Sequence, residues 1–138
     1  MQIIRDLSKE TFEFIESKRD WVRKHYTPAT VDNYKTLAGK FTLLDTILKS
    51  NWIEKQETWK LQSLGITLGD ILVQDMNFIW VEVEENDTID PALNFPDTTM
   101  LVFPMTMISK RVEKGEVFDI YDFYETLKED VNRIKLEA

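Results

Sequence analysis

Apolar residues recur at steps of three and four along most of the chain, a spacing that places them on one face of a helix. The first such stretch predicts a helix over about 9–25, with Ser8 as its N-cap. Thr27–Pro28 then predicts a second helix, because proline is tolerated in the first turn, and its apolar face continues to about Leu48. The short connection between the two helices predicts an antiparallel helical hairpin.

A third helical stretch is densest over 58–76 and contains two glycines one turn apart, Gly65 and Gly69. Each glycine lowers helix stability by about 1 kcal/mol relative to alanine, so the pair predicts that another segment packs closely there. A phosphate-binding loop over 64–69 is the alternative interpretation. It is disfavoured because the glycines lie within a helical period and no Lys-Ser/Thr pair follows them.

From residue 78 the period of the apolar positions changes from 3.6 to 2, which is typical of β-strands. The pattern predicts three strands, over 78–84, 89–95 and 99–103. Asn86–Asp87 and Pro96–Asp97 are expected to form the turns between them. Pro91 has no backbone N–H and therefore predicts an edge or a bulge in the second strand.

After the strands, the sequence predicts a short helix over 105–112 that stops at Gly115, and a last helix that starts at Asp119. No repeat or linker divides the chain, so we expect a single domain over residues 1–138. The predicted fold class is α+β: an N-terminal helical hairpin and further helices packed on a three-stranded antiparallel meander, with a C-terminal helix.

Composition excludes several classes of function. The 138 residues include no cysteine and one histidine, His25, so thiolate chemistry and the usual zinc ligand sets are absent. His25 lies among basic residues at a predicted helix end, where a cation stabilises the helix dipole; catalysis is the alternative role. A formal net charge of −8 disfavours binding to nucleic acid or anionic membranes. No apolar run approaches the roughly 18 residues that span a bilayer, and we expect a cytoplasmic protein without cofactor or metal.

The charge is unevenly distributed along the chain. Residues 1–60 carry eleven basic and nine acidic side chains, a net of plus two, whereas residues 61–138 carry six and sixteen, a net of minus ten. Five carboxylates lie at or near the predicted turn between the first two strands: Glu82, Glu84, Glu85, Asp87 and Asp90. Such an acidic tip would attract a basic protein and accelerate its association. The alternative is a solvated turn that keeps the sheet edges from aggregating.

Three neighbouring residues complete the candidate set. Trp80 shares a predicted strand face with Glu82 and Glu84, where it is either a core residue under a helix or an aromatic anchor for a partner. Lys110 and Arg111 follow a long stretch without basic residues, and we expect them to pair with the hairpin carboxylates or to bind an anionic ligand. The candidate partner-binding residues are therefore Trp80, Glu82, Glu84, Glu85, Asp87, Asp90, Lys110 and Arg111.

The segment from Leu64 to Ile120 resembles a bacterial family of small domains of unknown function. The resemblance is most specific over Phe103–Glu116, which reads Phe-Pro-x-Thr-x-Ile-Ser-Lys-Arg-x-Glu-x-Gly-Glu. It implies a bacterial origin and transfers no activity. The resemblance implies no more than an association of such families with secreted toxins as neutralising partners, and inhibition of a basic partner is one form of interaction that fits it.

These observations predict a non-enzymatic protein-interaction module with an acidic face that binds a basic protein. The alternative is a small-molecule-binding protein or enzyme with a carboxylate site near Trp80, Glu82 and Glu84, because adjacent carboxylates push their pKa values apart. An enzyme needs a pocket where these groups converge, whereas a binding module can present a flat acidic face. Leu101 and Phe103 are expected to be buried on the sheet.

Overall fold

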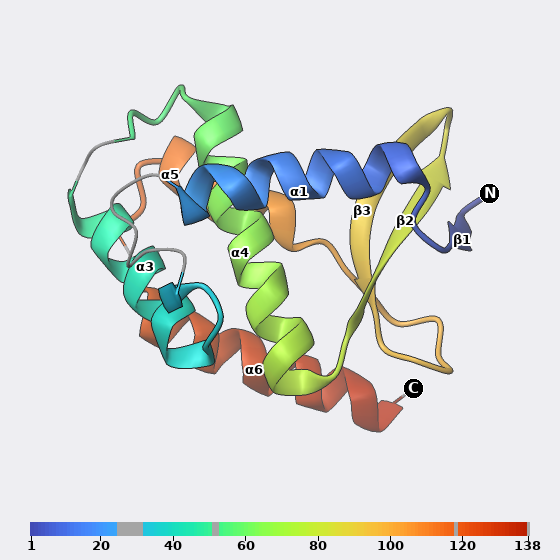
Figure 1. Cartoon of the computed structure of the whole chain (residues 1–138). Helices are drawn as coiled ribbons and strands as arrows, with labels where there is room; N and C mark the ends of the chain where they lie inside the picture. The colour runs from blue at the N-terminus through green and yellow to red at the C-terminus, as the bar shows by residue number, and fades with distance from the viewer. Residues whose placement is uncertain (25–31, 51–52, 118, 138) are drawn as a thin grey trace.

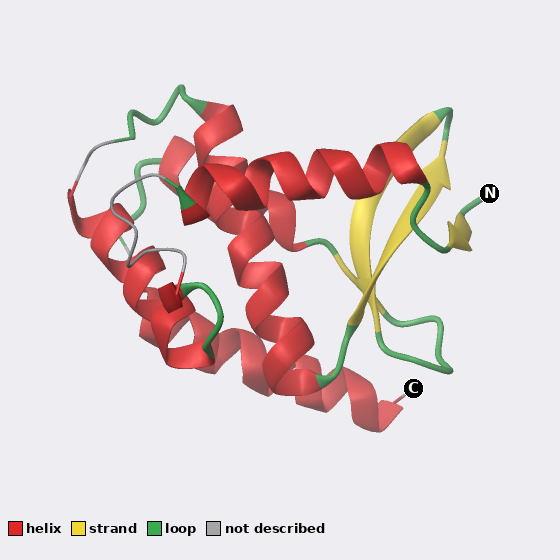
Figure 2. Ribbon diagram, in the orientation of Figure 1, coloured by secondary structure: helices red, strands yellow, loops and turns green. Residues whose placement is uncertain are grey.

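A computed structural model describes residues 1–24, 32–50, 53–117 and 119–137 of the chain. In chain order its elements are β1 (Ile3–Arg5), α1 (Lys9–Arg23), α3 (Leu37–Ser50), α4 (Thr58–Met76), β2 (Ile79–Glu85), β3 (Thr88–Asn94), β4 (Leu101–Val102), η1 (Pro104–Thr106), α5 (Met107–Glu113) and α6 (Ile120–Glu137). The sheet lies at one end of the molecule and the helices at the other, with α1 crossing from one to the other (Figures 1 and 2). The predicted α+β fold class is confirmed.

Helix α4 is the centre of the core, and its bounds agree with the predicted helix over 58–76. It is apolar on nearly every side, and helices α1, α3 and α5 together with η1 pack around it. Its fully buried apolar residues are Leu61, Leu64, Ile66, Leu68, Ile71 and Leu72. A helix surrounded in this way must be buried, which is why its sequence lacks a polar face.

The two glycines of α4 let other segments approach the helix closely, as predicted. A Cβ atom at Gly65 would collide with the backbone of Met105, and one at Gly69 would collide with the indole ring of Trp80. Both glycines lie in the middle of α4, so the phosphate-binding-loop interpretation does not apply.

Helix α1 begins as predicted, because the Ser8 hydroxyl accepts the backbone N–H of Thr11 at 3.2 Å. The predicted continuous second helix is wrong: the chain turns at 34–36, and α3 begins only at Leu37. The Thr36 hydroxyl accepts the N–H of Gly39 at 2.9 Å and so caps the new helix. His25 and Thr27–Pro28 lie outside the described residues.

The sheet has four antiparallel strands in the order β1-β2-β3-β4, one more than predicted. β2 and β3 pair around Asn86 and Asp87, whose φ angles of 52° and 64° fit the tight hairpin turn expected there. The additional strand, β1, pairs with β2 from Ile3↔Glu84 to Arg5↔Glu82. The sequence pattern does not predict β1 because three residues cannot display a period.

β4 covers only one end of β3, because it pairs with Leu93 and Asn94 alone. Pro104 then starts η1, and the chain leaves the sheet. The edge of β3 over 88–92 consequently has no partner strand within the described residues. Pro91 lies on this stretch, where its missing N–H costs no strand pairing, so the predicted edge position is confirmed.

The predicted burial of Phe103 is wrong, since its side chain is 38% exposed, while Leu101 is half-buried. β4 ends at Val102, and from Phe103 onward the chain turns into η1, so strand alternation no longer determines where the side chains lie. The sheet positions Trp80, Leu93 and Val102 join the main core, together with Phe78 just before β2.

The C-terminal elements follow the prediction. Gly115 adopts φ 76° after α5, and the N–H of Glu116 donates back to the carbonyl of Arg111 at 3.0 Å. Asp119 precedes α6 and accepts the N–H of Tyr121 at 3.2 Å. None of the helices in the described ranges has the length and hydropathy needed to cross a bilayer.

Candidate functional site

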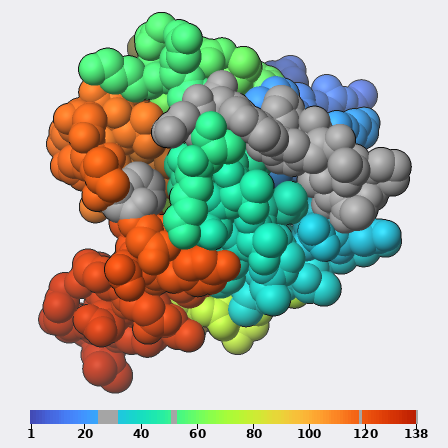
Figure 3. Space-filling view, turned by 90° about the vertical axis from the view of Figure 1, so that its left-hand side faces the viewer, coloured from blue at the N-terminus to red at the C-terminus, as the bar shows by residue number. Residues whose placement is uncertain are grey.

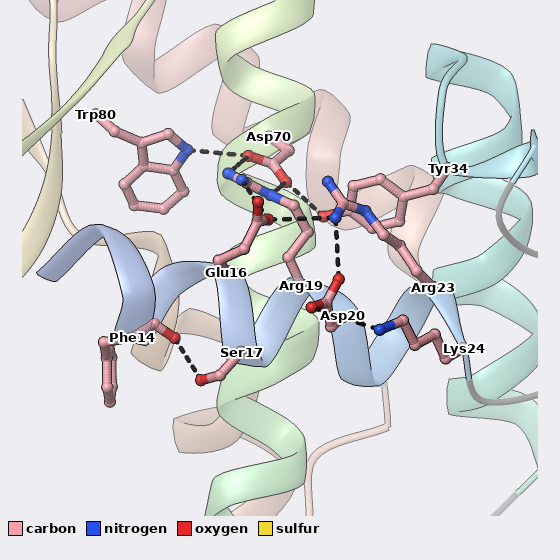
Figure 4. Close-up of polar contacts among 10 residues, drawn as sticks. All are labelled: Phe14, Glu16, Ser17, Arg19, Asp20, Arg23, Lys24, Tyr34, Asp70 and Trp80. Carbon is pink, nitrogen blue, oxygen red and sulfur yellow. Dashed lines mark hydrogen bonds and ion pairs between the residues drawn. The ribbon is translucent and has the colours of Figure 1, made fainter. Parts of the chain in front are cut away.

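The most densely connected polar cluster centres on the carboxylate of Asp70, in the middle of α4 (Figure 4). Arg19 of α1 donates to both oxygens, with Nε 2.7 Å from Oδ2 and Nη2 2.8 Å from Oδ1. The indole N–H of Trp80 donates to Oδ1 at 2.9 Å, and the hydroxyl of Tyr34 donates to Oδ2. The cluster therefore joins α1, α4, β2 and the turn before α3.

The Asp70 carboxylate has no free acceptor position, because four donors occupy the roughly four lone-pair directions of its oxygens. Burial and the charge of Asp70 raise the pKa of Tyr34 well above its usual value, so the phenol stays a donor. Burial lowers the pKa of Arg19, but the hydrogen bond and charge of Asp70 outweigh it and raise the pKa overall. We conclude that this cluster fastens elements together rather than performing proton chemistry.

Three of the predicted site residues lie on β2 and face the rest of the fold. Trp80 packs against Gly69 and binds Asp70, an arrangement typical of a core residue under a helix. Glu82 is only 2% exposed and accepts from Arg5 Nε at 2.9 Å and from the N–H of Ser8 at 2.8 Å. Glu84 is 2.7 Å from Nη2 of the same Arg5.

The N–H of Ser8 and the guanidinium of Arg5 lower the pKa of Glu82 to about 2, although burial opposes the change. Glu82 is therefore an ionised anchor for β1 and for the start of α1. A general acid needs a raised pKa, so the arrangement offers no support for the carboxylate-site alternative.

The remaining acidic candidates are exposed. Glu85 and Asp87 lie at the end of the β2–β3 hairpin, and Asp90 lies just beyond it on β3. No ion pair of these three is found among the described residues, so they form the uncompensated part of the predicted acidic tip. We call Glu85, Asp87 and Asp90 the acidic hairpin end.

The two basic candidates, Lys110 and Arg111, are adjacent in the chain but have different neighbours. Arg111 lies 4.6 Å from the ring centre of Phe123 and 3.9 Å from Glu116, so its partners are local. Lys110 is exposed and shares the lining of a surface hollow with Asp90. Neither residue forms an ion pair with the hairpin carboxylates in the described part of the chain.

A groove runs along the uncovered edge of β3, between α1 and η1. It consists of two hollows of about 220 and 340 Å³ that share Asp90, Pro91 and Met105. Three large apolar side chains, exposed by 40%, 49% and 38%, line it: Phe14, Ile89 and Phe103. We call this feature the β3 groove.

The backbone of β3 also presents hydrogen-bonding groups to the groove. The N–H of Phe95 donates to the carbonyl of Met100 at 3.2 Å, on the β4 side of the strand. Backbone groups alternate in direction along a strand, so Ile89 and Pro91 point to that side as well. The N–H of Ile89 and the backbone carbonyls of Ile89 and Pro91 therefore point toward the groove.

Sequence reasoning placed Asp90 and Lys110 in the candidate set but missed the apolar lining of the groove. Phe14 and Ile89 lie at apolar positions of the predicted helix and strand, and the spacing of apolar residues does not show that these two side chains are exposed. The groove exists because β4 is short and η1 turns away, and Pro104 is the one local signal of that turn. Over the described ranges, no group of three or more His, Cys, Asp or Glu side chains is arranged to hold a metal ion.

Comparison with known proteins adds a family and a structural neighbour. The family model for a domain of unknown function, DUF3806, matches residues 40–124, from α3 into α6. No curated protein matches the chain. A crystal structure from Bacteroides thetaiotaomicron VPI-5482 is similar, with a TM-score of 0.73 and 15% sequence identity. The alignment covers 91% of this chain and 47% of the other, so the chain spans about half of that protein and shares its fold.

Proposed function

Because the chain belongs to the DUF3806 family, a domain family of unknown function, we propose its role from its own geometry: it is a protein-interaction module that binds a basic protein. The binding surface consists of the β3 groove and the acidic hairpin end. The partner supplies an extended segment in which apolar side chains are flanked by lysine or arginine. The observation that carries this proposal is that exposed apolar side chains, an unpaired strand edge and uncompensated carboxylates meet at one place.

The apolar part of the surface supports a protein ligand rather than a small molecule. Phe14 of α1, Ile89 of β3 and Phe103, the residue between β4 and η1, border one continuous groove. Single exposed apolar residues are common, but a group of them around a groove is typical of an interaction site. Burial of these side chains by a partner would supply most of the binding free energy.

The charge of the surface determines the kind of partner. Glu10 and Asp90 line the groove, the other two carboxylates of the acidic hairpin end lie nearby in the chain, and Lys110 is the single basic residue of the lining. The chain as a whole carries a formal charge of −8. A basic protein is attracted to such a surface, and an acidic one is repelled.

The strand edge favours an extended ligand. A segment lying beside β3, where β4 would otherwise continue, can donate to the carbonyls of Ile89 and Pro91. It needs no acceptor opposite Pro91, which has no N–H. If the bound segment belongs to the partner's own active surface, binding also inhibits the partner.

The experiment compares groove variants with a matched control. Ile89→Ser and Phe14→Ser change exposed apolar residues of the groove, whereas Ile134→Ser changes an α6 residue that is 45% exposed and lies outside it. A partner captured by the parent protein is purified, and its dissociation constant is measured with each variant. We expect the two groove variants to bind at least about tenfold more weakly and the control to bind like the parent. Equal affinity for all three variants would reject the groove as the binding surface.

A further inference from the structure

A separate hollow, of about 260 Å³, lies between α3, α4 and α6, on the helical side of the molecule. Figure 3 shows the face on which α3 and α6 lie side by side. Three aromatic rings line the hollow: Phe41 of α3 with Tyr121 and Tyr124 of α6. This hollow shares no lining residue with the β3 groove and takes no part in the proposed function.

The three rings pack as one aromatic group. Phe41 stacks on Tyr121 with ring centres 5.5 Å apart and planes 20° apart, and it meets Tyr124 edge-on at 5.0 Å. Tyr121 is 44% exposed, so part of this group is accessible from solvent. The faces of aromatic rings are negative, and they attract cations that water holds weakly.

The charges of the lining also favour a cation. Three carboxylates, Asp75, Asp122 and Glu125, line the hollow together with one ammonium group, that of Lys128, which lies 3.3 Å from Asp75. The Tyr124 hydroxyl also donates to Asp75 at 2.7 Å, so that carboxylate already has two partners. Asp122 and Glu125 form no ion pair within the described residues, which leaves two uncompensated negative charges at the hollow.

The ionisation of Tyr124 is consistent with this arrangement. Burial, followed by the hydrogen bond and charge of Asp75, raises the pKa of Tyr124. The ring therefore remains a neutral phenol and keeps its donor bond to Asp75 at physiological pH. An anionic ligand would meet the uncompensated carboxylates at close range, so the lining excludes phosphates and carboxylic acids.

The same chain already places alkylammonium groups over aromatic rings elsewhere. Lys18 Nζ lies 4.3 Å from the ring centre of Trp59, and Lys135 Nζ lies 4.1 Å from that of Phe95. In the hollow, the ammonium of Lys128 binds Asp75, and the aromatic group beside it has no cation partner of this kind in the described part of the structure. The fold therefore already uses contacts between ammonium groups and aromatic rings, and at the hollow a ligand can supply the ammonium group.

We propose that this hollow binds a small organic cation of the alkylammonium class, with its charged head against Tyr121 and Phe41 and between Asp122 and Glu125. A metal ion is a poorer fit, because hard cations require several oxygen ligands at short range. A methylated ammonium is weakly hydrated and gains from both aromatic and carboxylate neighbours.

The test uses choline and its uncharged analogue of the same shape, 3,3-dimethyl-1-butanol. Each is titrated into the ¹⁵N-labelled protein, and backbone amide shifts are followed by NMR. We expect saturable shifts with choline for residues of the hollow, with a dissociation constant near about 1 mM, and binding of the alcohol at least roughly tenfold weaker. Equal binding of the two compounds, or no saturable shift with choline, would overturn the proposal.

Two variants locate the site. Asp122→Asn removes one exposed charge, and Tyr121→Ala removes one ring; both are expected to weaken choline binding by about fivefold or more. Glu129→Gln, an exposed α6 carboxylate outside the hollow, is the control and should bind choline like the parent. Unchanged binding in the Asp122→Asn variant, which leaves the packed side chains in place, would reject the site even if Tyr121→Ala fails to fold.

Discussion

Arg19 and Asp70 form a two-bonded ion pair between α1 and α4, with nitrogen–oxygen distances of 2.7 and 2.8 Å. A second polar contact joins the same helices, because Lys18 Nζ of α1 donates to the carbonyl of Trp59 of α4 at 3.4 Å. Tyr34 and Trp80 donate to the same carboxylate, so one side chain of α4 fixes the position of three other segments. Loss of this carboxylate should therefore affect more of the fold than loss of a surface charge.

We expect Asp70→Asn to lower the free energy of unfolding by about 3 kcal/mol, because the guanidinium of Arg19 would keep its partial burial, lose its two-bonded partner and retain only its single contact with Glu16 at 3.0 Å. Chemical denaturation measures the effect. The matched control is Asp130→Asn, which breaks the exposed pair with Arg133 and should change stability by less than about 1 kcal/mol. Equal changes in the two variants would show that the Asp70 cluster contributes no more than a surface pair.

Glu82 should make the protein sensitive to acid. Its pKa is lowered to about 2 from the ordinary 4.5, so its contribution to stability is complete above pH 4.5. Between pH 4.5 and 2 the unfolded chain binds this proton and the folded chain does not, so stability falls as the pH falls. Melting temperatures between pH 6 and 2.5 should fall less steeply for Glu82→Gln than for the parent. Glu85→Gln, at the exposed turn, should keep the parental slope, and identical slopes for all three would contradict the assignment.

Lys18 should make stability depend on pH in the alkaline range. Its ammonium is buried beside Trp59 and Phe14, and this burial lowers its pKa from 10.5 to about 8. Between pH 8 and 10.5 the unfolded chain holds a proton that the folded chain has lost, so stability should rise with pH in this window.

Lys18→Met should remove that rise and increase the free energy of unfolding at pH 7 by about 1 kcal/mol, because an apolar side chain replaces a buried cation. Denaturation at pH 7, 8.5 and 10 measures both effects. The matched control is Lys24→Met at the exposed end of α1, which should keep the parental rise. A Lys18→Met variant with an unchanged slope would contradict the lowered pKa.

The acidic hairpin end should govern the rate at which the partner binds. We expect the triple variant Glu85→Gln, Asp87→Asn, Asp90→Asn to slow association several-fold at low salt and to flatten its salt dependence, with little change in stability. Stopped-flow or surface-based kinetics with the purified partner measures the rate.

The control for the hairpin variant removes the same number of charges from α6: Glu129→Gln, Asp130→Asn and Glu137→Gln. Both proteins then carry the same net charge, so a difference in rate reports the position of the charges. If both variants associate at the same rate, the hairpin carboxylates are a solvated turn without a role in encounter.

The parts of the fold that sequence could predict are those with local signals. Helix α4 was predictable to its ends because its period and its two glycines lie within one segment. Strand β1 was not, because its three residues become a strand only through pairing with β2, and Arg5 meets Glu82 across a separation of 77 positions. Phe103 was misplaced because strand alternation was extended one residue past the end of β4.

In the candidate site, too, local sequence features could be predicted and contacts between distant segments could not. The acidic turn was visible in the sequence as a run of carboxylates, but the pairing of Glu82 and Glu84 with Arg5 depends on a distant strand. The Asp70 cluster gathers its members from four separate segments, and nothing in the spacing of Arg19, Tyr34 and Asp70 indicates that they meet. Contacts of this kind follow from the fold and not from any local pattern.

The way β1 joins the sheet also bears on the order of folding. The β2–β3 hairpin and α4 are neighbours in the chain and can form with short loops to close. β1 has no surface to pair with until β2 is in place, and its docking must close a loop of 77 positions. We therefore expect β1 to be the last strand to form and the first to open in the native state, with the amide hydrogens of Ile3 and Arg5, which point toward β2, exchanging faster than those of β2.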